Sequence, residues 1–352
     1  MSRIPAHARI LDAHRRLRHW LLAAPIQVME GPQRGGVAGM LTAEGRVEYV
    51  YPEITGYYLH WLARPDVHAL PQARARAAAA VDWAERAYAV SEPMTRVHLQ
   101  PHADDWRNRN RFVFDLGMLA GGLAAAWSRE LVRPMPALAA RVQELALGYV
   151  DGSGLLQAVA QPAELQRWST SAGPFLAKPA SRLLMLDRVH PGPASLRDAC
   201  DRTLAAYPPT GLPGHVELHP ALYHLEGAAC RQPDHAGMAA SLACMLAMED
   251  GEGRLPETPQ ADLLRCDVTA QALRLSLWLQ EAGVDPTDEA RMTRMAGALA
   301  DAVDGDGGVG FRLDRHAPER NIWCAMFAEQ ALAAWLRAQA HGRSGLVADD
   351  IV

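Results

Sequence analysis

The sequence lacks the features that direct a chain into a membrane or onto nucleic acid. No apolar run approaches the roughly 20 residues that a membrane-spanning helix needs, and the basic N-terminal stretch lacks the apolar centre of a signal peptide. The net charge of -5 provides no general attraction for nucleic acid or for anionic lipid. These absences predict a cytoplasmic protein without a nucleic-acid partner or a membrane span.

Cysteine is scarce and poorly placed for cross-linking. The chain has 5 cysteines, widely spaced and without a CxxC pair: Cys200, Cys230, Cys244, Cys266 and Cys324. An odd number at such spacing argues against a disulfide framework and against a zinc ribbon. We expect most of them to be small buried hydrophobic side chains.

Motifs for cofactors and nucleophiles are also missing. The chain has no GxGxxG after a strand, no P-loop, no HExxH and no GxSxG. Cys266, Asp267 and His219 could in principle hold zinc, but no spacing argues for it. Residues 304–307 begin like a calcium loop and lack the ligand pattern that should follow. We therefore predict neither a metal nor a cofactor.

A turn rich in glycine recurs along the chain. Its clear copies lie at residues 35–39, 151–155, 250–254 and 304–311, with weaker copies at 97–102 and 210–215. The average spacing is about 54 residues. A period of this size, with helical sequence between the turns, predicts an array of helical hairpins that carries its turns on one face.

The segments between the turns have helical character, because alanine is abundant and apolar residues recur at helical spacing. We expect about twelve helices in six hairpins, forming one domain over residues 1–352 with the all-α architecture of an (α/α)6 toroid. The expected helices span residues 5–24, 52–64, 70–90, 106–127, 133–149, 170–187, 194–206, 219–231, 235–248, 265–283, 287–303 and 319–339.

The connections alternate in length, which predicts which helices are inner. Those after even-numbered helices are short and contain proline, whereas those after odd-numbered helices are long and carry the glycine turns. Residues 116–127 have no charge and contain Gly117, Gly121 and Gly122, as expected of a buried helix in close contact with its neighbours. The even-numbered helices should therefore be inner, with their N-termini pointing at one mouth.

Carboxylates at the starts of these inner helices are the candidate acids and bases. We assign catalytic roles to Glu53, Asp105, Glu226 and Asp267, with Tyr57 as a partner acid for elimination or epimerisation. Each has a structural alternative. Glu53 is favoured by the helix dipole alone, and Asp105 or Asp267 could simply cap a helix. Glu226 lies among apolar residues, where a carboxylate must be either paired or functional.

Cations, aromatic rings and amides at the same helix starts are candidate substrate ligands. Arginine or lysine can hold a carboxylate or phosphate, and flat rings can stack on sugars. Lys178 could also extend its charge toward solvent, and the histidines are more often structural. The predicted substrate-binding residues are Tyr51, His102, Trp106, Arg109, Arg111, Trp168, Lys178, His219, Tyr223, Arg265, Gln271, Asn321 and Trp323.

Three segments resemble a known family. The resemblance is to α/α-toroid proteins encoded among bacterial exopolysaccharide genes. These proteins are often labelled squalene-cyclase or prenyltransferase-repeat-like. The segments that resemble them are residues 35–37 with the YPEITGY element at 51–57, residues 223–227 and residues 266–272. The resemblance implies an α/α toroid and a connection to glycans. The terpene-cyclase part of that label fits less well, because the DxDD acid and the QxxxGxW repeats are absent and aromatic content is 6%.

Three functions remain open at this point. The first is an enzyme acting on a sugar or a uronic-acid-containing glycan, as a hydrolase, lyase or epimerase, with a small molecule or oligosaccharide as its partner. The second is a cyclase or tailoring enzyme for small molecules on the same fold. The third is a glycan-binding protein without catalysis, whose carboxylates could be neutralised without loss of function.

Overall fold

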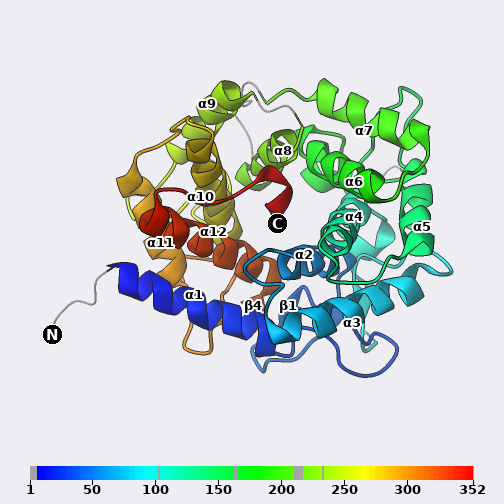
Figure 1. Cartoon of the computed structure of the whole chain (residues 1–352), viewed down its shortest axis with the longest axis horizontal. Coiled ribbons are helices and arrows are strands. Elements are labelled where there is room, and N and C mark those ends of the chain that lie inside the picture. The colour runs from blue at the N-terminus through cyan, green and yellow to red at the C-terminus, as the bar shows by residue number, and fades with distance from the viewer. Residues whose placement is uncertain are drawn as a thin grey trace. The chain divides into compact units, whose positions relative to one another are not determined.

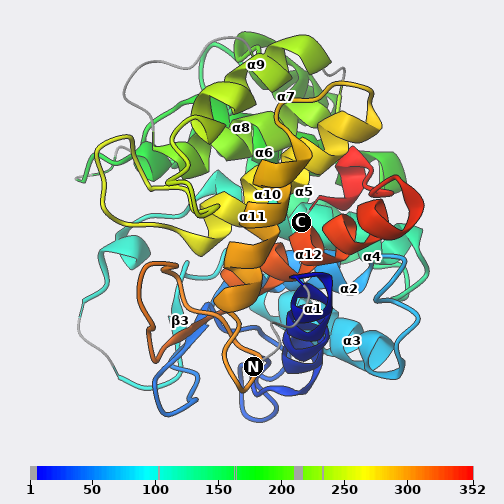
Figure 2. The same cartoon turned by 90° about the vertical axis from the view of Figure 1, so that its left-hand side faces the viewer.

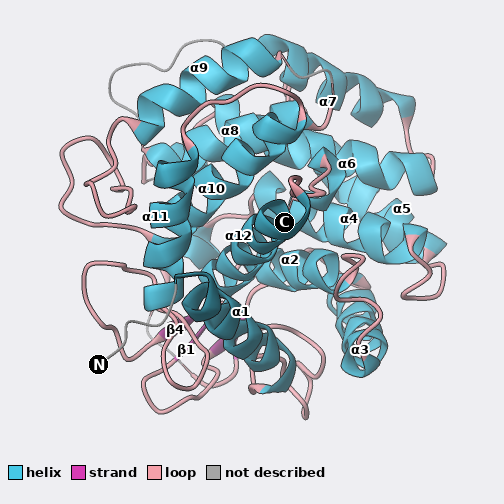
Figure 3. Cartoon of the chain, turned by 60° about the vertical axis from the view of Figure 1, so that its left-hand side comes forward, coloured by secondary structure: helices cyan, strands magenta, loops and turns pink. Residues whose placement is uncertain are grey.

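The structure is a computed structural model that describes residues 6–101, 104–161, 163, 165–209, 217–231 and 234–351. Within these residues the chain forms twelve α helices joined by long loops, with four strands of two residues each (Figure 3). The all-α class predicted from the sequence is confirmed. None of the described helices combines the length and apolarity needed to cross a bilayer.

The helices follow the predicted order. They are α1 (Ala6–Ala23), α2 (Pro52–Leu62), α3 (Pro71–Tyr88), α4 (Val113–Ser128), α5 (Pro136–Leu147), α6 (Ala177–Val189), α7 (Ala194–Ala206), α8 (Leu218–Ala229), α9 (His235–Leu246), α10 (Cys266–Glu281), α11 (Glu289–Asp301) and α12 (Ile322–His341). The strands are β1 (Met40–Leu41), β2 (Tyr49–Val50), β3 (Val97–His98) and β4 (Arg320–Asn321).

Two predicted helix starts are wrong. Residues 106–109 form a short 3-10 turn, and α4 begins only at Val113 because Phe112 is extended and bridges Val159. The helix predicted from residue 170 begins at Ala177. Gly173 precedes a proline and is extended, because the proline ring disfavours helical geometry at the residue before it.

Internal contacts divide the chain into two compact units. The first unit comprises Pro25–Leu41 and Arg46–Pro208, and the second comprises Met1–Ala24, Thr42–Gly45 and Pro209–Val352. The single domain expected from the sequence stays a prediction.

In the first unit, α4 packs between α2 and α6, and α3, α5 and α7 form a second layer beside them (Figure 1). Glycine residues allow the central helices to pack closely against one another, as the sequence predicted for α4. A Cβ on Gly117 would lie 2.5 Å from the Pro179 side chain of α6, and one on Gly122 would lie 2.2 Å from the Gly56 carbonyl oxygen of α2. Larger residues would force these helices apart.

In the second unit, α10 packs between α8 and α12, with α9, α11 and α1 in the outer layer. Helix α1 contacts α12 and α11, so the first helix of the chain completes a hairpin with the last (Figure 2). The central helices are buried on nearly every face, whereas the outer helices bury one face. The predicted division into inner and outer helices therefore holds in each unit.

The repeated glycine turns share one geometry in both units. Gly35, Gly253 and Gly307 have φ values of 96°, 86° and 93°, which favour glycine. A Cβ there would lie 1.9 Å from the backbone of α3, 2.3 Å from that of α11 and 2.5 Å from that of α1. Each turn can therefore rest directly on an outer helix. The weak copies that include His102 and residues 210–215 lie partly outside the described residues.

The segment after each turn leads the chain to the start of a central helix. The N–H groups of Tyr51, Arg265 and Asn321 donate to the carbonyl groups of residues 37, 255 and 309. These three residues are the N-caps of α2, α10 and α12. The repeat thus brings the residues that follow into equivalent positions, and this equivalence organises the candidate site.

Candidate active-site clusters

The second residue of the central helices carries most of the reactive groups. It is Glu53 in α2, Lys178 in α6, His219 in α8, Asp267 in α10 and Trp323 in α12. In α4 this position is Phe114, and Asp115 follows it. The first turn of a helix offers unpaired N–H groups and a positive dipole end. The sequence-predicted concentration of polar groups at helix starts is therefore observed, while convergence on one mouth stays a prediction.

In the first unit, Glu53 is a half-buried carboxyl with an unusual protonation equilibrium. Burial raises its pKa from 4.5 to about 7, although the Tyr51 hydroxyl donates a hydrogen bond to it and the charge of Lys178 favours the anion. Lys178 is fully buried, and its Nζ atom lies 4.9 Å from the centroid of the Tyr57 ring. The predicted residues Tyr51, Glu53, Tyr57 and Lys178 therefore form one cluster.

Asp115 is a member of this cluster that was not among the predicted site residues. It is only 5% exposed and accepts a hydrogen bond of 3.0 Å from the Thr95 hydroxyl. Burial raises its pKa well above the usual range, and the neighbouring Glu53 and Glu92 raise it further. The available signal was a single carboxylate at the start of an otherwise uncharged buried helix. The charge of Glu53 thus disfavours ionisation of Asp115.

The structure gives Asp105 a capping role. Its carboxylate accepts from the Arg107 N–H at 3.1 Å, and it pairs with Arg96 at 3.1 Å. Burial opposes ionisation, but the Arg107 N–H and the Arg96 charge outweigh it and lower the pKa of Asp105. The capped element is the 3-10 turn at 106–109, whereas the structural alternative to the predicted catalytic role was the cap of a long helix.

The loops before α4 and α6 combine arginine with tryptophan. The guanidinium groups of Arg107 and Arg167 both lie over the Trp106 ring, at 4.6 and 4.7 Å from its centroid. Trp168 packs edge-on against Phe175, with ring centroids 5.1 Å apart. Two further predicted ligands have local partners: exposed Arg109 pairs with Asp104, and Arg111 donates to the Glu92 carbonyl. His102 lies outside the described residues.

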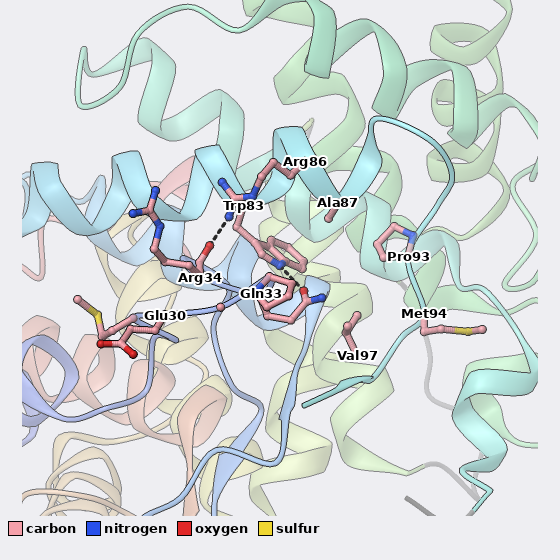
Figure 4. A pocket seen from close by; sticks show the side chains of 12 residues that line it. Glu30, Gln33, Arg34, Trp83, Arg86, Ala87, Pro93, Met94 and Val97 are labelled. Carbon is pink, nitrogen blue, oxygen red and sulfur yellow. Dashed lines mark hydrogen bonds between the residues drawn. The ribbon is translucent and has the colours of Figure 1, made fainter. Parts of the chain in front are cut away.

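The first unit also contains two hollows. One of about 600 Å³ is bounded by Arg96, His98, Asp105 and Arg109. A larger one of about 900 Å³ lies between α3 and the loop at 29–34, where Trp83 donates to Gln33 and Arg86 donates to the Arg34 carbonyl (Figure 4). The larger hollow contains no predicted site residue, so volume alone does not identify the reactive cluster.

In the second unit, Asp267 is an anion held by Arg265. The two side chains form a bidentate pair at 2.6 and 3.0 Å, and the Trp323 indole N–H donates to Asp267 at 3.1 Å. Burial opposes ionisation, but the Arg265 charge holds the pKa of Asp267 well below its usual range. Asp267 and Glu53 thus occupy equivalent positions in the repeat and have opposite pKa shifts.

The preceding N-cap residue explains this contrast. Two residues before Asp267 the chain has Arg265, whose positive charge stabilises the anion. Two residues before Glu53 it has Tyr51, a neutral donor that offsets burial only in part. Burial and the residue two positions earlier therefore set the pKa of each carboxyl within its own unit.

His219 and Tyr223 extend the cluster around Asp267. The His219 Nδ1 atom lies 2.7 Å from the Gln271 Oε1 atom and 3.6 Å from the Asp267 Oδ2 atom. Burial lowers the pKa of His219 to about 4, so the ring is neutral at pH 7. Its centroid lies 4.2 Å from that of Tyr223. The structure therefore brings together the predicted ligands His219, Tyr223, Arg265, Gln271 and Trp323.

Two other predicted residues have structural partners. Glu226 is fully buried and forms a 2.6 Å ion pair with Arg274, which was not predicted, and it accepts from Gln271 at 3.2 Å. This contact supports the paired alternative for Glu226. Asn321 caps α12 by accepting from the Cys324 N–H at 2.9 Å. In the described part of the chain, no group of three or more His, Cys, Asp or Glu side chains is arranged to hold a metal ion.

Solved structures match the chain over nearly its whole length. No protein-family model and no curated protein matches the sequence. A glycosidase in complex with glucose superposes with a TM-score of 0.65 at 14% identity, covering 96% of this chain and 99% of that one. An α-amylase from Clostridium perfringens gives 0.63 at 10% identity, covering 91% and 96%. An unsaturated glucuronyl hydrolase from Streptococcus agalactiae gives 0.61 at 12% identity, covering 94% and 92%.

The fold class is the (α/α)6 toroid. This confirms the architecture predicted from the repeated turns. At identities of this size the likeness concerns the fold, and activity has to be argued from the residues of the chain itself.

Proposed function

We propose that the chain is a carbohydrate-active enzyme that uses Glu53 as its general acid. The observation that carries the proposal is a half-buried carboxyl with a pKa of about 7 at the start of a central helix, beside a second carboxyl with a raised pKa. A general acid works best when its pKa is near the working pH. The fold is one on which glycosidases and unsaturated glucuronyl hydrolases are built.

The cluster supplies what cleavage of a glycosidic bond requires. Protonated Glu53 gives its proton to the bridging oxygen as the bond to the sugar carbon breaks, and water supplies the hydroxyl for that carbon while its remaining proton restores protonated Glu53. The Tyr51 hydroxyl orients the Glu53 carboxyl. The charge of Glu53 raises the pKa of the neighbouring Asp115, which makes a doubly ionised pair unfavourable and so keeps a proton available. Hydrolysis is therefore our first choice, ahead of elimination or epimerisation.

We infer that the substrate is acidic. Lys178 is a buried cation beside Glu53, and it can hold a sugar carboxylate close to the acid. The Trp168 ring can stack on a sugar face, and Arg107 and Arg167, whose guanidinium groups lie 4.6 and 4.7 Å from the Trp106 ring centroid, can attract an acidic sugar. A uronic-acid-containing oligosaccharide matches this combination. The exopolysaccharide connection implied by the sequence resemblance belongs to the same proposal.

The test is turnover of a panel of saccharides by the wild type and by Glu53→Gln. The panel pairs neutral with uronic-acid-containing oligosaccharides, and products are followed as reducing ends and by mass spectrometry. Loss of a general acid should lower kcat by about 10²- to 10⁴-fold. The matched control is Glu144→Gln, a change at an exposed carboxylate on α5 of the same unit. Wild-type turnover that survives Glu53→Gln would refute the assignment, and saccharide binding without any turnover would favour a binding protein.

A further inference from the structure

The segment before the first glycine turn is longer than its counterparts in the repeat. Gly35 stands 12 residues after the end of α1. The corresponding glycines follow the ends of α5, α9 and α11 by 7, 7 and 6 residues, at Gly154, Gly253 and Gly307. The additional residues include the loop at 29–34, which forms one wall of the hollow of about 900 Å³. Because the other copies of the turn lack these residues, the turn itself does not require them.

Hydrogen bonds hold this loop against α3. The Trp83 indole N–H donates to the Gln33 Oε1 atom at 2.9 Å, and the Trp83 side chain is only 1% exposed. The Arg86 guanidinium donates to the Asp82 carbonyl at 2.9 Å and to the Arg34 carbonyl (Figure 4). The wall is therefore fixed by contacts within the first unit, and a ligand would find the hollow already formed.

The hollow exposes apolar side chains to water. Met29 is 67% exposed and Met94 is 45% exposed, and these are two of the five large apolar side chains that the described residues expose. They come from different segments, the additional loop and the chain after α3, and Val97 and Pro32 line the same hollow. Exposed apolar side chains that gather at one hollow are typical of a binding site.

The same hollow has an excess of positive charge. Arg34 and Arg86 line it, and Glu30 is the acidic residue among the described lining residues. Within the part of the chain that the structure describes, the Arg34 guanidinium has no hydrogen-bond or ion-pair partner. Figure 4 shows the Trp83 ring between Arg34 on one side and Met94 on the other. A ligand here can thus meet apolar walls and a cation together.

We propose that this hollow binds an aromatic anion, a flat apolar ring system that carries a carboxylate or sulfonate group. Arg34 binds the acidic group, because a guanidinium fork matches two anion oxygens. Met29 and Met94 pack on the rings, since thioether groups adapt to flat surfaces and contact aromatic rings favourably. The volume lies within the range of small-molecule sites, roughly 300 to 1,000 Å³. The proposal goes beyond the carbohydrate activity and does not depend on it.

The decisive experiment is carbon-13 NMR of the full-length protein, labelled at its methionine methyl groups and titrated with anilinonaphthalene sulfonate. Met29→Leu and Met94→Leu assign the two signals. Ring currents of the bound probe should shift both signals in a saturable way, while Met295, buried in the second unit, should not respond. Saturation that leaves Met29 and Met94 unshifted, or no saturation below about 1 mM, would overturn the proposal.

A matched pair of probes tests the role of Arg34. Phenylnaphthylamine has the same ring system as anilinonaphthalene sulfonate and lacks the sulfonate. Arg34→Gln should weaken binding of the sulfonate about tenfold and leave binding of the uncharged probe unchanged. The control is Arg133→Gln, at a side chain that is 63% exposed and outside the hollow, which should change neither. Equal effects of Arg34→Gln on both probes, or none on either, would refute its role.

The apolar wall is tested in the same way. Met94→Gln should weaken binding of both probes about three- to tenfold, because it removes apolar contact that the two probes share. Val347→Thr, at an exposed apolar side chain of the second unit, is the control and should have no effect. Tighter binding of decanoate, an aliphatic anion, than of the sulfonate probe would overturn the assignment of an aromatic ligand. These readouts need no turnover, so failure of the proposed function leaves them interpretable.

Discussion

Replacing Glu53 by glutamine should remove activity and at the same time stabilise the protein at alkaline pH. The folded state raises the pKa of Glu53 from 4.5 to about 7, so it binds this proton more tightly than the unfolded chain does. The contribution of this bound proton to the free energy of unfolding is fully present below pH 4.5 and is lost as the pH rises through about 7. The pKa difference corresponds to about 3 kcal/mol.

Glutamine has the size of protonated glutamate and cannot ionise. We therefore expect Glu53→Gln to match the wild type at pH 4 within about 0.5 kcal/mol and to exceed it at pH 8 by about 1 to 3 kcal/mol. Urea unfolding followed by circular dichroism at the two pH values measures this difference. Glu144→Gln, at an exposed site, should show no such pH dependence.

Two outcomes would contradict this reasoning. Equal stabilisation by Glu53→Gln at both pH values would show that the carboxyl does not ionise within this range. Destabilisation at pH 8 would show that ionised Glu53 is favourable in the folded state, and that attraction to Lys178 outweighs burial.

Three further predictions follow from the contacts of the two units. Arg274→Met should destabilise the protein by about 3 to 5 kcal/mol in urea unfolding, because it leaves Glu226 buried without its ion pair, and adding Glu226→Leu should recover part of the loss. Gly253→Ala should cost about 2 to 4 kcal/mol, because it combines positive φ with contact to the α11 backbone, whereas Gly305→Ala, in open space, should be nearly neutral. Lys178→Met should raise KM for acidic saccharides about tenfold and leave KM for neutral ones unchanged, if Lys178 binds the sugar carboxylate. Equal effects on both classes would argue against that role.

Local signals in the sequence predicted most of the architecture. The glycine turns require glycine for a local reason, a positive φ against an outer helix, so their spacing is visible without any structure. The starts of α4 and α6 were missed because a strand-like bridge at Phe112 and an extended Gly173 depend on partners or on local backbone geometry that periodicity does not report.

For the candidate site residues too, the sequence determined some properties and the tertiary structure determined others. The sequence by itself determined that Glu53, His219 and Asp267 stand at helix starts, whereas it placed Lys178 two turns inside a helix that begins only at Ala177 in the structure. Only the tertiary structure decided what they do there. Glu226 is paired because α10 brings Arg274 to it, and the pKa of Asp115 is raised by burial and further by Glu53, which α2 brings to it. Charge states depend on burial and on neighbours from other helices, and distances of a few ångströms between such helices are set by packing.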